Sequence, residues 1–232
     1  MGMTKKDFTN MVKEFAKSCG ADIVGVAPVN RFDEAPEGFH PTDIIDGAKS
    51  VISIGIELPL GVVMGKSRAS MTKTISTTFN ALDHCAYRIA CYIEKTGALT
   101  VSVPSDSPCE WYDVEKQEGR GDLSQKHAAF LSGLGELGKS SMFLCPEFGN
   151  KVSLGSVVTT MELESDSLFD GKLCIENCNK CITSCPAGAI QEDGTVIQKE
   201  CKKYHNIITA KGLSLFNCWE CRRVCPVRGA KI

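Results

Sequence analysis

No hydrophobic run in this 232-residue chain approaches the roughly 20 apolar residues that a membrane-spanning helix needs. The sequence also lacks a basic segment followed by an apolar one near its start, which is the pattern of a secretory leader. These absences argue against a membrane protein and a secreted one. We therefore expect a soluble, cytoplasmic protein that has no membrane partner.

Cysteine is abundant instead, and eight of the thirteen cysteines lie in the last quarter of the chain. They form two groups, Cys174-x-x-x-Cys178-x-x-Cys181-x-x-x-Cys185-Pro186 and Cys201 followed by Cys218-x-x-Cys221-x-x-x-Cys225-Pro226. So many thiols in a chain without a leader favour metal binding over a disulfide framework, in a reducing and oxygen-poor setting.

This spacing resembles that of bacterial ferredoxins with two [4Fe-4S] clusters, in which the cysteine before proline ligates the other cluster. By that rule one cluster takes Cys174, Cys178, Cys181 and Cys225, and the other takes Cys185, Cys201, Cys218 and Cys221. Zinc is the alternative metal, although a tetrahedral zinc site has no need of the repeated Cys-Pro ending. Three residues, not two, separate Cys174 from Cys178, which leaves open whether Cys174 is a ligand.

The formal net charge of −2 hides an asymmetry between the two parts of the chain. Residues 171–232 contain ten Lys and Arg against five Asp and Glu, or +5, so residues 1–170 carry −7. The basic side chains are expected to compensate the negative charge of the clusters. The alternative is a docking patch for an acidic electron donor or nucleic acid, made by Lys199, Lys202, Lys203, Arg222, Arg223 and Arg228.

Helical and extended patterns alternate ahead of the cysteines, which predicts an α+β layer domain over 1–168 and a cysteine-rich domain over 169–232. Apolar spacing predicts helices over 4–20, 75–95 and 122–131. Runs of β-branched residues predict strands over 21–29, 47–59, 98–103 and 151–163, the last one being a strand or half of a hairpin. The acidic stretch 104–121 has few aliphatic residues and is expected to be a long exposed loop.

The segment GLGELGK contains Gly133-x-Gly135-x-x-Gly138, which taken alone matches a dinucleotide-binding fingerprint. That fingerprint needs a strand before the glycines, a helix after them and an acidic residue about twenty positions further on. Here a helical stretch comes first, an extended stretch follows, and no acid lies near residue 158. A helix end followed by a tight turn is the plainer interpretation.

The order of these motifs resembles that of epoxyqueuosine reductases and corrinoid-dependent reductive dehalogenases. The shared order is a helix ending in GLGELGK, a short extended segment, PEFG, a hydrophobic strand and two Cys-Pro motifs. ADIVGVAP, AKSVISIGIELP and CPAGAI resemble further segments of that family. The resemblance implies a nitroreductase-like α/β domain that holds cobalamin and a two-[4Fe-4S] ferredoxin-like module that feeds electrons to the cobalt.

The resemblance also implies particular site residues. Gly133, Gly135, Gly138 and Lys139 would form a cofactor groove together with the 104–121 loop. PSDSPCE approximates the family's proton-donor segment, so Asp106 is the candidate catalytic acid, and a solvated loop acid is the alternative. The family has an Arg-Gly-rich segment that contains Tyr-His before the long helix. This chain has SMTKTISTTFNAL in its place. The chain ends seven residues after Cys225, without the family's tRNA-holding helical repeats, which argues against tRNA as a partner.

Together these observations predict an iron–sulfur oxidoreductase that passes electrons from two [4Fe-4S] clusters to a corrinoid, or else a flavin, for a reductive reaction. The expected electron donor is a low-potential protein such as ferredoxin or flavodoxin. Two alternatives stay open. One is a ferredoxin-type electron carrier without chemistry of its own, and the other is a reductive activator of a separate corrinoid protein.

Overall fold

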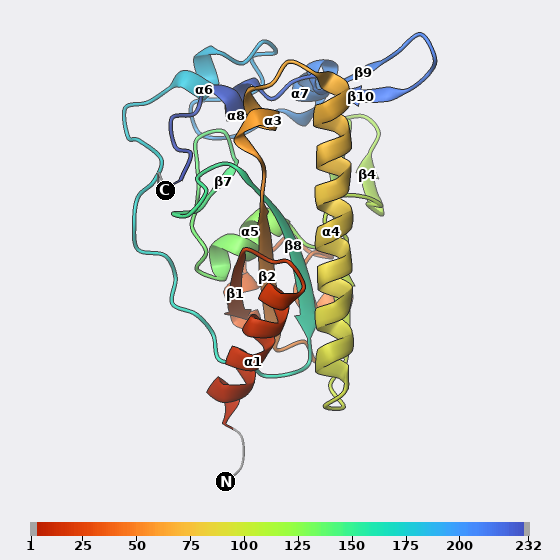
Figure 1. Cartoon of the computed structure of the whole chain (residues 1–232), viewed down its shortest axis with the longest axis vertical. Coiled ribbons are helices and arrows are strands. Elements are labelled where there is room, and N and C mark those ends of the chain that lie inside the picture. Colours follow the sequence, from red (N-terminus) through yellow and green to blue (C-terminus); the bar gives the residue numbers. More distant parts are fainter. Residues whose placement is uncertain (1–3, 230–232) are drawn as a thin grey trace.

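The computed structural model describes residues 4–229, and a four-stranded antiparallel sheet lies at its centre (Figure 1). The strands stand in the order β1 (Ile23–Pro28), β2 (Ser50–Glu57), β8 (Val152–Thr159) and β3 (Thr100–Val103). The central pair, β2 and β8, runs in register from Ser50 opposite Thr159 to Glu57 opposite Val152. All four strands lie inside the ranges predicted from β-branched runs, which confirms the mixed α/β class.

Helices cover both faces of this sheet, as Figure 1 shows. On one face α1 (Lys5–Ser18) and α4 (Arg68–Glu94) pack on a core that includes Ile52, Ile54 and Val157. On the other face α5 (Gln125–Leu131) packs over Val51 and Val158. Successive residues of a strand point to opposite faces of the sheet. Adjacent residues such as Val51 and Ile52, therefore, belong to different cores. The result is a three-layer arrangement.

The helix ends follow local capping chemistry. Thr4 and Asp7 form a reciprocal capping box at the start of α1, with Thr4 Oγ1 accepting from the Asp7 N–H at 3.1 Å. The helix α4 starts at Arg68, seven residues earlier than predicted, because the Ser67 hydroxyl accepts from the Ser70 N–H and opens the helix there. Within residues 4–229 no helix is both long and apolar enough to cross a membrane.

The prediction of an exposed loop over 104–121 is wrong for its second half, which forms a short hairpin of β4 (Trp111–Asp113) and β5 (Glu118–Arg120). Trp111 lies opposite Arg120, whose guanidinium carbon is 4.6 Å from the indole centroid. Gln117 turns the chain with a φ of 53°. The many acidic residues suggested a loop, but the aromatic pair Trp111 and Tyr112 gives cross-strand partners that stabilise a hairpin.

Shorter elements join the main ones. They are η1 (Val29–Phe32), α2 (Pro41–Ile44), α3 (Leu60–Met64), β6 (Glu136–Leu137) and β7 (Phe143–Leu144). None of them was predicted as a separate element, although the extended stretch expected after the glycines contains β7.

The cysteine-rich segment lies beyond the end of the sheet at which α4 begins, and a long connection after β8 leads to it along the side of the molecule (Figure 1). Its elements are α6 (Lys180–Thr183), α7 (Gln198–His205), β9 (Asn206–Ile208), β10 (Ser214–Phe216) and α8 (Glu220–Val224). The Phe216 N–H donates to Thr72 Oγ1 of α4 at 2.9 Å. Arg223 donates to the carbonyls of Val63 and Gly65, both at 3.3 Å. The segment is therefore hydrogen-bonded to the sheet domain.

We expect Leu82→Ala to lower the free energy of unfolding by about 2–5 kcal/mol, because Leu82 is fully buried between α4 and the sheet. Anaerobic urea unfolding followed by circular dichroism would measure this. Tyr87→Ala, on the same helix but 58% exposed, serves as the control and is expected to change stability little. Equal losses in the two variants would contradict the assignment of this core.

Candidate redox site

The first group of cysteines lines one small cavity of about 30 Å³. Its members are Cys174, Cys178, Cys181 and Cys225. Cys181 lies in α6 and Cys225 directly follows α8, and these two helices pack against each other. A cysteine near the end of the sequence therefore joins three that lie more than forty positions earlier.

The second group consists of cysteines whose thiols lie close enough to raise one another's pKa. Burial raises the pKa of Cys201, and the neighbouring thiols of Cys185 and Cys218 raise it further. Burial also raises the pKa of Cys221 to about 11, and Cys201 and Cys218 are again among its neighbours. The two groups have the membership that the ferredoxin rule predicts, while their role as metal ligands stays a prediction.

Burial keeps thiols of both groups protonated more strongly than a free cysteine. It raises the pKa of Cys225 as well, and the nearby thiols of Cys174, Cys181 and Cys178 raise it further. Metal ligation requires the thiolate, so a bound cation would have to offset this raised pKa. All thirteen cysteines are free thiols. Within the described chain, no three His, Cys, Asp or Glu side chains form a group that could hold a single metal ion.

The GLGELGK segment holds the loop that carries the first group. The Lys139 ammonium donates to the carbonyl of Cys178 at 3.0 Å and also to that of Glu176. Glu136 Oε1 accepts the N–H of Leu173 at 2.5 Å and that of Cys174. This segment thus fixes both ends of the loop at residues 173–178.

Two glycines of the same segment allow close backbone packing. A Cβ at Gly133, which has a φ of +76°, would lie 2.0 Å from the Ser167 carbonyl oxygen, and a Cβ at Gly135 would lie 1.9 Å from that of Leu144. Gly138 and Lys139 lie at the cavity of the first cysteine group. Their predicted role in a cofactor groove stays a prediction.

We expect Lys139→Met to reduce the occupancy of a metal at the first cysteine group, because the loop would lose hydrogen bonds from a charged donor, worth about 1.5–3 kcal/mol each. Metal analysis after gel filtration would measure this loss. Lys172→Met is the matched control, since Lys172 is 67% exposed and contacts only Glu176 on the same loop. A full metal content in Lys139→Met would contradict the bracing role.

Asp106 is exposed and lies beside the cysteine-rich segment. Its carboxylate acts on His205 of α7, where it opposes the burial that lowers the pKa of that imidazole. The preceding residue, Ser105, is tied to α4 by hydrogen bonds from its N–H and its hydroxyl to Asp83 Oδ1, at 2.9 and 2.7 Å. The loop is thus anchored next to α7, and the role of Asp106 as a proton donor stays a prediction.

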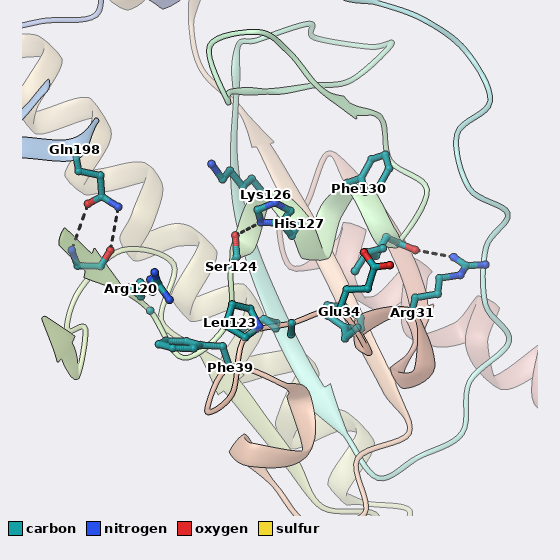
Figure 2. Close-up of a pocket in the computed structure, with 16 residues that line it drawn as sticks. Arg31, Glu34, Phe39, Arg120, Leu123, Ser124, Lys126, His127, Phe130 and Gln198 are labelled. Atoms are coloured by element: carbon teal, nitrogen blue, oxygen red, sulfur yellow. Dashed lines mark hydrogen bonds between the residues drawn. The ribbon is translucent and has the colours of Figure 1, made fainter. Parts of the chain in front are cut away.

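A larger cavity of about 620 Å³ lies on the α5 side of the sheet (Figure 2). The side chains labelled in Figure 2 are Arg31, Glu34, Phe39, Arg120, Leu123, Ser124, Lys126, His127, Phe130 and Gln198. The end of the 104–121 segment contributes Gly119, Arg120 and Gly121, as predicted for the groove, but the turn over 133–139 does not line it. Residues 31–39 and α5 form the remaining walls, and the sequence reasoning missed them because no motif marks them.

Short connections join this cavity to both cysteine groups. Lys126, which lines the cavity, donates to the hydroxyl of Ser141, a residue with a φ of 57° next to the turn at the first group. Gln198 exchanges two hydrogen bonds of 3.3 Å with the backbone of Gly119 and lies three residues before Cys201 on α7. Hydrogen bonds thus join the cavity to the segment beside the first group and to α7, which carries Cys201 of the second group.

A partly buried arginine, Arg222, lies next to cysteines of both groups. Arg222 directly follows Cys221 and precedes Cys225 by three residues, and its guanidinium stacks 5.1 Å from the Trp219 ring. It donates to the carbonyl of Asn150, while the Asn150 amide donates to the Arg222 carbonyl at 2.8 Å. Arg222 Nε and Asn150 Oδ1 are buried and have no hydrogen-bond partner among the described residues. An unpaired buried N–H beside cysteine thiols fits a site whose sulfur atoms accept hydrogen bonds.

No protein-family profile matches the sequence. Among curated proteins, the chain is 30% identical to epoxyqueuosine reductase of Prochlorococcus marinus over an alignment of 262 positions, gaps included, that covers 95% of this chain and 78% of the relative. It is 24% identical to the epoxyqueuosine reductase of Bacillus anthracis, and there it spans only 62% of the relative's length. Tetrachloroethene reductive dehalogenase of Desulfitobacterium hafniense is 26% identical over 83% of this chain and 32% of its own.

Solved structures share the fold. A B12-dependent reductive dehalogenase matches 96% of this chain and 32% of its own with a TM-score of 0.73 at 17% identity. An epoxyqueuosine reductase with an epoxyqueuosine-modified tRNA-Tyr stem loop matches 97% of this chain and 66% of its own, with a TM-score of 0.65 at 19% identity. The fold and the similar proteins define a superfamily of reductases and reductive dehalogenases. Within it, the chain belongs to the epoxyqueuosine reductase family.

The expectation that tRNA is not a partner is wrong. It rested on the missing repeats after Cys225. An epoxyqueuosine reductase of the same fold has been solved with a tRNA stem loop, and this finding contradicts the expectation.

Proposed function

We propose that this protein is an iron–sulfur reductase in which two [4Fe-4S] clusters pass single electrons to a site in the larger cavity. One observation carries the proposal. Cys225, from the last motif, lies with the three cysteines of the first motif around one cavity. Such an exchange of the final cysteine between two motifs is the arrangement of two-cluster ferredoxins, and a pair of independent zinc sites does not need it.

The surroundings of the thiols support clusters in both groups. The segment 169–232 would form the ferredoxin-like domain, with Cys174, Cys178, Cys181 and Cys225 holding one cluster. Cys185, Cys201, Cys218 and Cys221 would hold the other. Arg222 supplies a partly buried positive charge and a buried, unpaired Nε–H near both groups, which suits two anionic cofactors.

The sheet domain, residues 1–168, would hold the electron acceptor. A corrinoid is our first choice, since a similar structure is described as a B12-dependent dehalogenase, and a flavin is the alternative. A bound corrinoid would supply a cobalt ion that accepts electrons and cleaves a bond reductively. Phe39 and Phe130 would exclude water from one side, while Arg120 and Lys126 would meet negatively charged groups. Asp106 is kept as the candidate proton donor.

The substrate and partners are part of the proposal, because the chain spans 62% of the length of the first curated relatives. The family relationship makes an epoxyqueuosine-containing tRNA stem loop the first substrate to test. A ferredoxin or flavodoxin would supply the electrons. The ferredoxin-type carrier and the corrinoid-protein activator remain the alternatives. The larger cavity, whose Lys126 and Gln198 are hydrogen-bonded to or lie on segments next to the cysteine groups, favours an enzyme over a carrier.

Iron and acid-labile sulfide analysis of anaerobically purified protein tests the clusters, with about eight of each expected per chain for two cubanes. Zinc without sulfide would contradict the proposal. Visible spectra with and without added cobalamin then test the acceptor, and a yellow supernatant after acid precipitation would indicate flavin instead. Turnover of the modified stem loop with reduced flavodoxin tests the substrate, and clusters without any bound acceptor or turnover would leave an electron carrier.

A further inference from the structure

The larger cavity carries positive charge that nearby carboxylates do not balance. Arg31, Arg120 and Lys126 line it, and Glu34 is the acidic residue in its lining. Arg31 is engaged elsewhere, because it donates to the carbonyls of Leu131 at 2.6 Å and Asp166 at 2.8 Å and points away from the cavity in Figure 2. Among the ion pairs found in residues 4–229, none includes Arg120 or Lys126. Two basic groups therefore face the cavity without a carboxylate partner.

Aromatic rings hold Arg120 in position. Its guanidinium carbon lies 4.6 Å from the Trp111 centroid and 5.5 Å from the Phe39 centroid. These two rings meet edge to face, with centroids 6.1 Å apart. Cation–π contacts fix a guanidinium without using its N–H groups, so the planar fork stays available for two parallel hydrogen bonds. Such a fork matches carboxylate and phosphate.

A second cation faces the same space from α5. Lys126 is partly buried, and the Ser141 hydroxyl accepts its hydrogen bond. Burial lowers the pKa of Lys126, so an anion placed beside its ammonium would offset lost hydration. Its neighbour His127 shares a 2.7 Å hydrogen bond with the Ser124 hydroxyl through Nδ1. Figure 2 shows Lys126 and His127 on one side of the cavity and Arg120 with Phe39 on another.

The remaining lining is apolar, with Phe32, Leu123 and Phe130 among its members. A cavity of about 620 Å³ lies within the range of about 300–1,000 Å³ that holds drug-sized ligands. We propose that this cavity binds an organic anion. Its carboxylate or phosphate is held between Arg120 and Lys126, while its apolar part packs against Phe32, Leu123 and Phe130. That this ligand is the species the clusters reduce, or part of their acceptor cofactor, rests on the proposed function.

Calorimetric titration of the anaerobic, full-length protein at low ionic strength tests the proposal. The probes are benzoate and phenyl phosphate, with uncharged benzamide as the comparison. We expect both anions to bind at least about tenfold more tightly than benzamide, since only the anions accept charge-assisted hydrogen bonds from Arg120 and Lys126. Arg120→Gln and Lys126→Gln are each expected to remove about tenfold of that affinity. Lys116→Gln is the matched control, because Lys116 is 69% exposed on the same hairpin and outside the cavity.

Paired cofactors separate the two sources of the anion. Cobalamin carries a phosphate that cobinamide lacks, and FMN carries one that riboflavin lacks. If the protein binds the phosphate-bearing member of a pair more tightly, and Arg120→Gln abolishes this difference, the site belongs to a cofactor. If only benzoate and phenyl phosphate bind tightly, the site belongs to a substrate. Equal binding of benzoate and benzamide, or unchanged binding in both variants, would overturn the proposal. Iron and sulfide are measured on every sample, so this failure with intact clusters would leave the proposed iron–sulfur function standing.

Discussion

Cys225→Ser is expected to lose about half of the iron and sulfide, because it removes one thiolate from the cluster that Cys174, Cys178 and Cys181 would also hold. The remaining cluster, at the other four cysteines, should still give a charge-transfer absorption of reduced intensity. Anaerobic metal analysis and visible spectroscopy would measure both quantities. Cys91→Ser is the control, since Cys91 is exposed on α4 and belongs to neither group.

Paired replacements make this test specific for the exchange of cysteines between the motifs. Cys178→Ser together with Cys225→Ser should lose no more iron than either single change, because both thiols belong to one group. Cys178→Ser together with Cys201→Ser should lose nearly all of it, since Cys201 lies in the other group. The opposite result, with all iron lost in the first pair, would mean that each motif binds its own cluster.

Arg222→Gln is expected to lower the reduction potential of at least one cluster by on the order of 60–120 mV, the one-electron equivalent of about 1.4–3 kcal/mol. The physical reason is the loss of a partly buried positive charge and of the buried Nε–H donor near two anionic cofactors. The change should also destabilise the fold, because it removes the hydrogen bond to the Asn150 carbonyl. Redox titration followed by electron paramagnetic resonance would measure the potential.

Two further variants separate charge from packing at this position. Arg222→Lys keeps the charge and should recover part of the potential. Arg223→Gln changes the neighbouring residue of α8, whose guanidinium pairs with Glu220 at 3.0 Å and is 33% exposed, and should shift the potential little. A potential that is unchanged in Arg222→Gln, with both clusters present, would show that the buried charge does not act on them.

The strands and long helices could be predicted because each follows from neighbouring residues. Val51, Ile52 and Ile54 belong to a short run of β-branched residues along β2, and such a run predicts a strand buried on both faces. The hairpin at Trp111 was missed because its stability depends on contacts of Arg120 with Trp111 and Phe39, and Phe39 is more than seventy residues away in the sequence. Side-chain contacts of this kind leave no periodic pattern.

The sequence by itself determined the layer class of the fold and the two cysteine motifs, because periodicity and short spacers are local properties of a chain. Only the tertiary structure decided that Cys225 joins the cysteines of the first motif, that Lys139 braces the cysteine loop and that Arg222 Nε is buried without a partner. It also decided that Arg120 and Lys126 share a cavity that the 133–139 turn does not reach. Burial and long-range contacts set these roles, since the free energy of a charge depends on the atoms packed around it and not on its place in the chain.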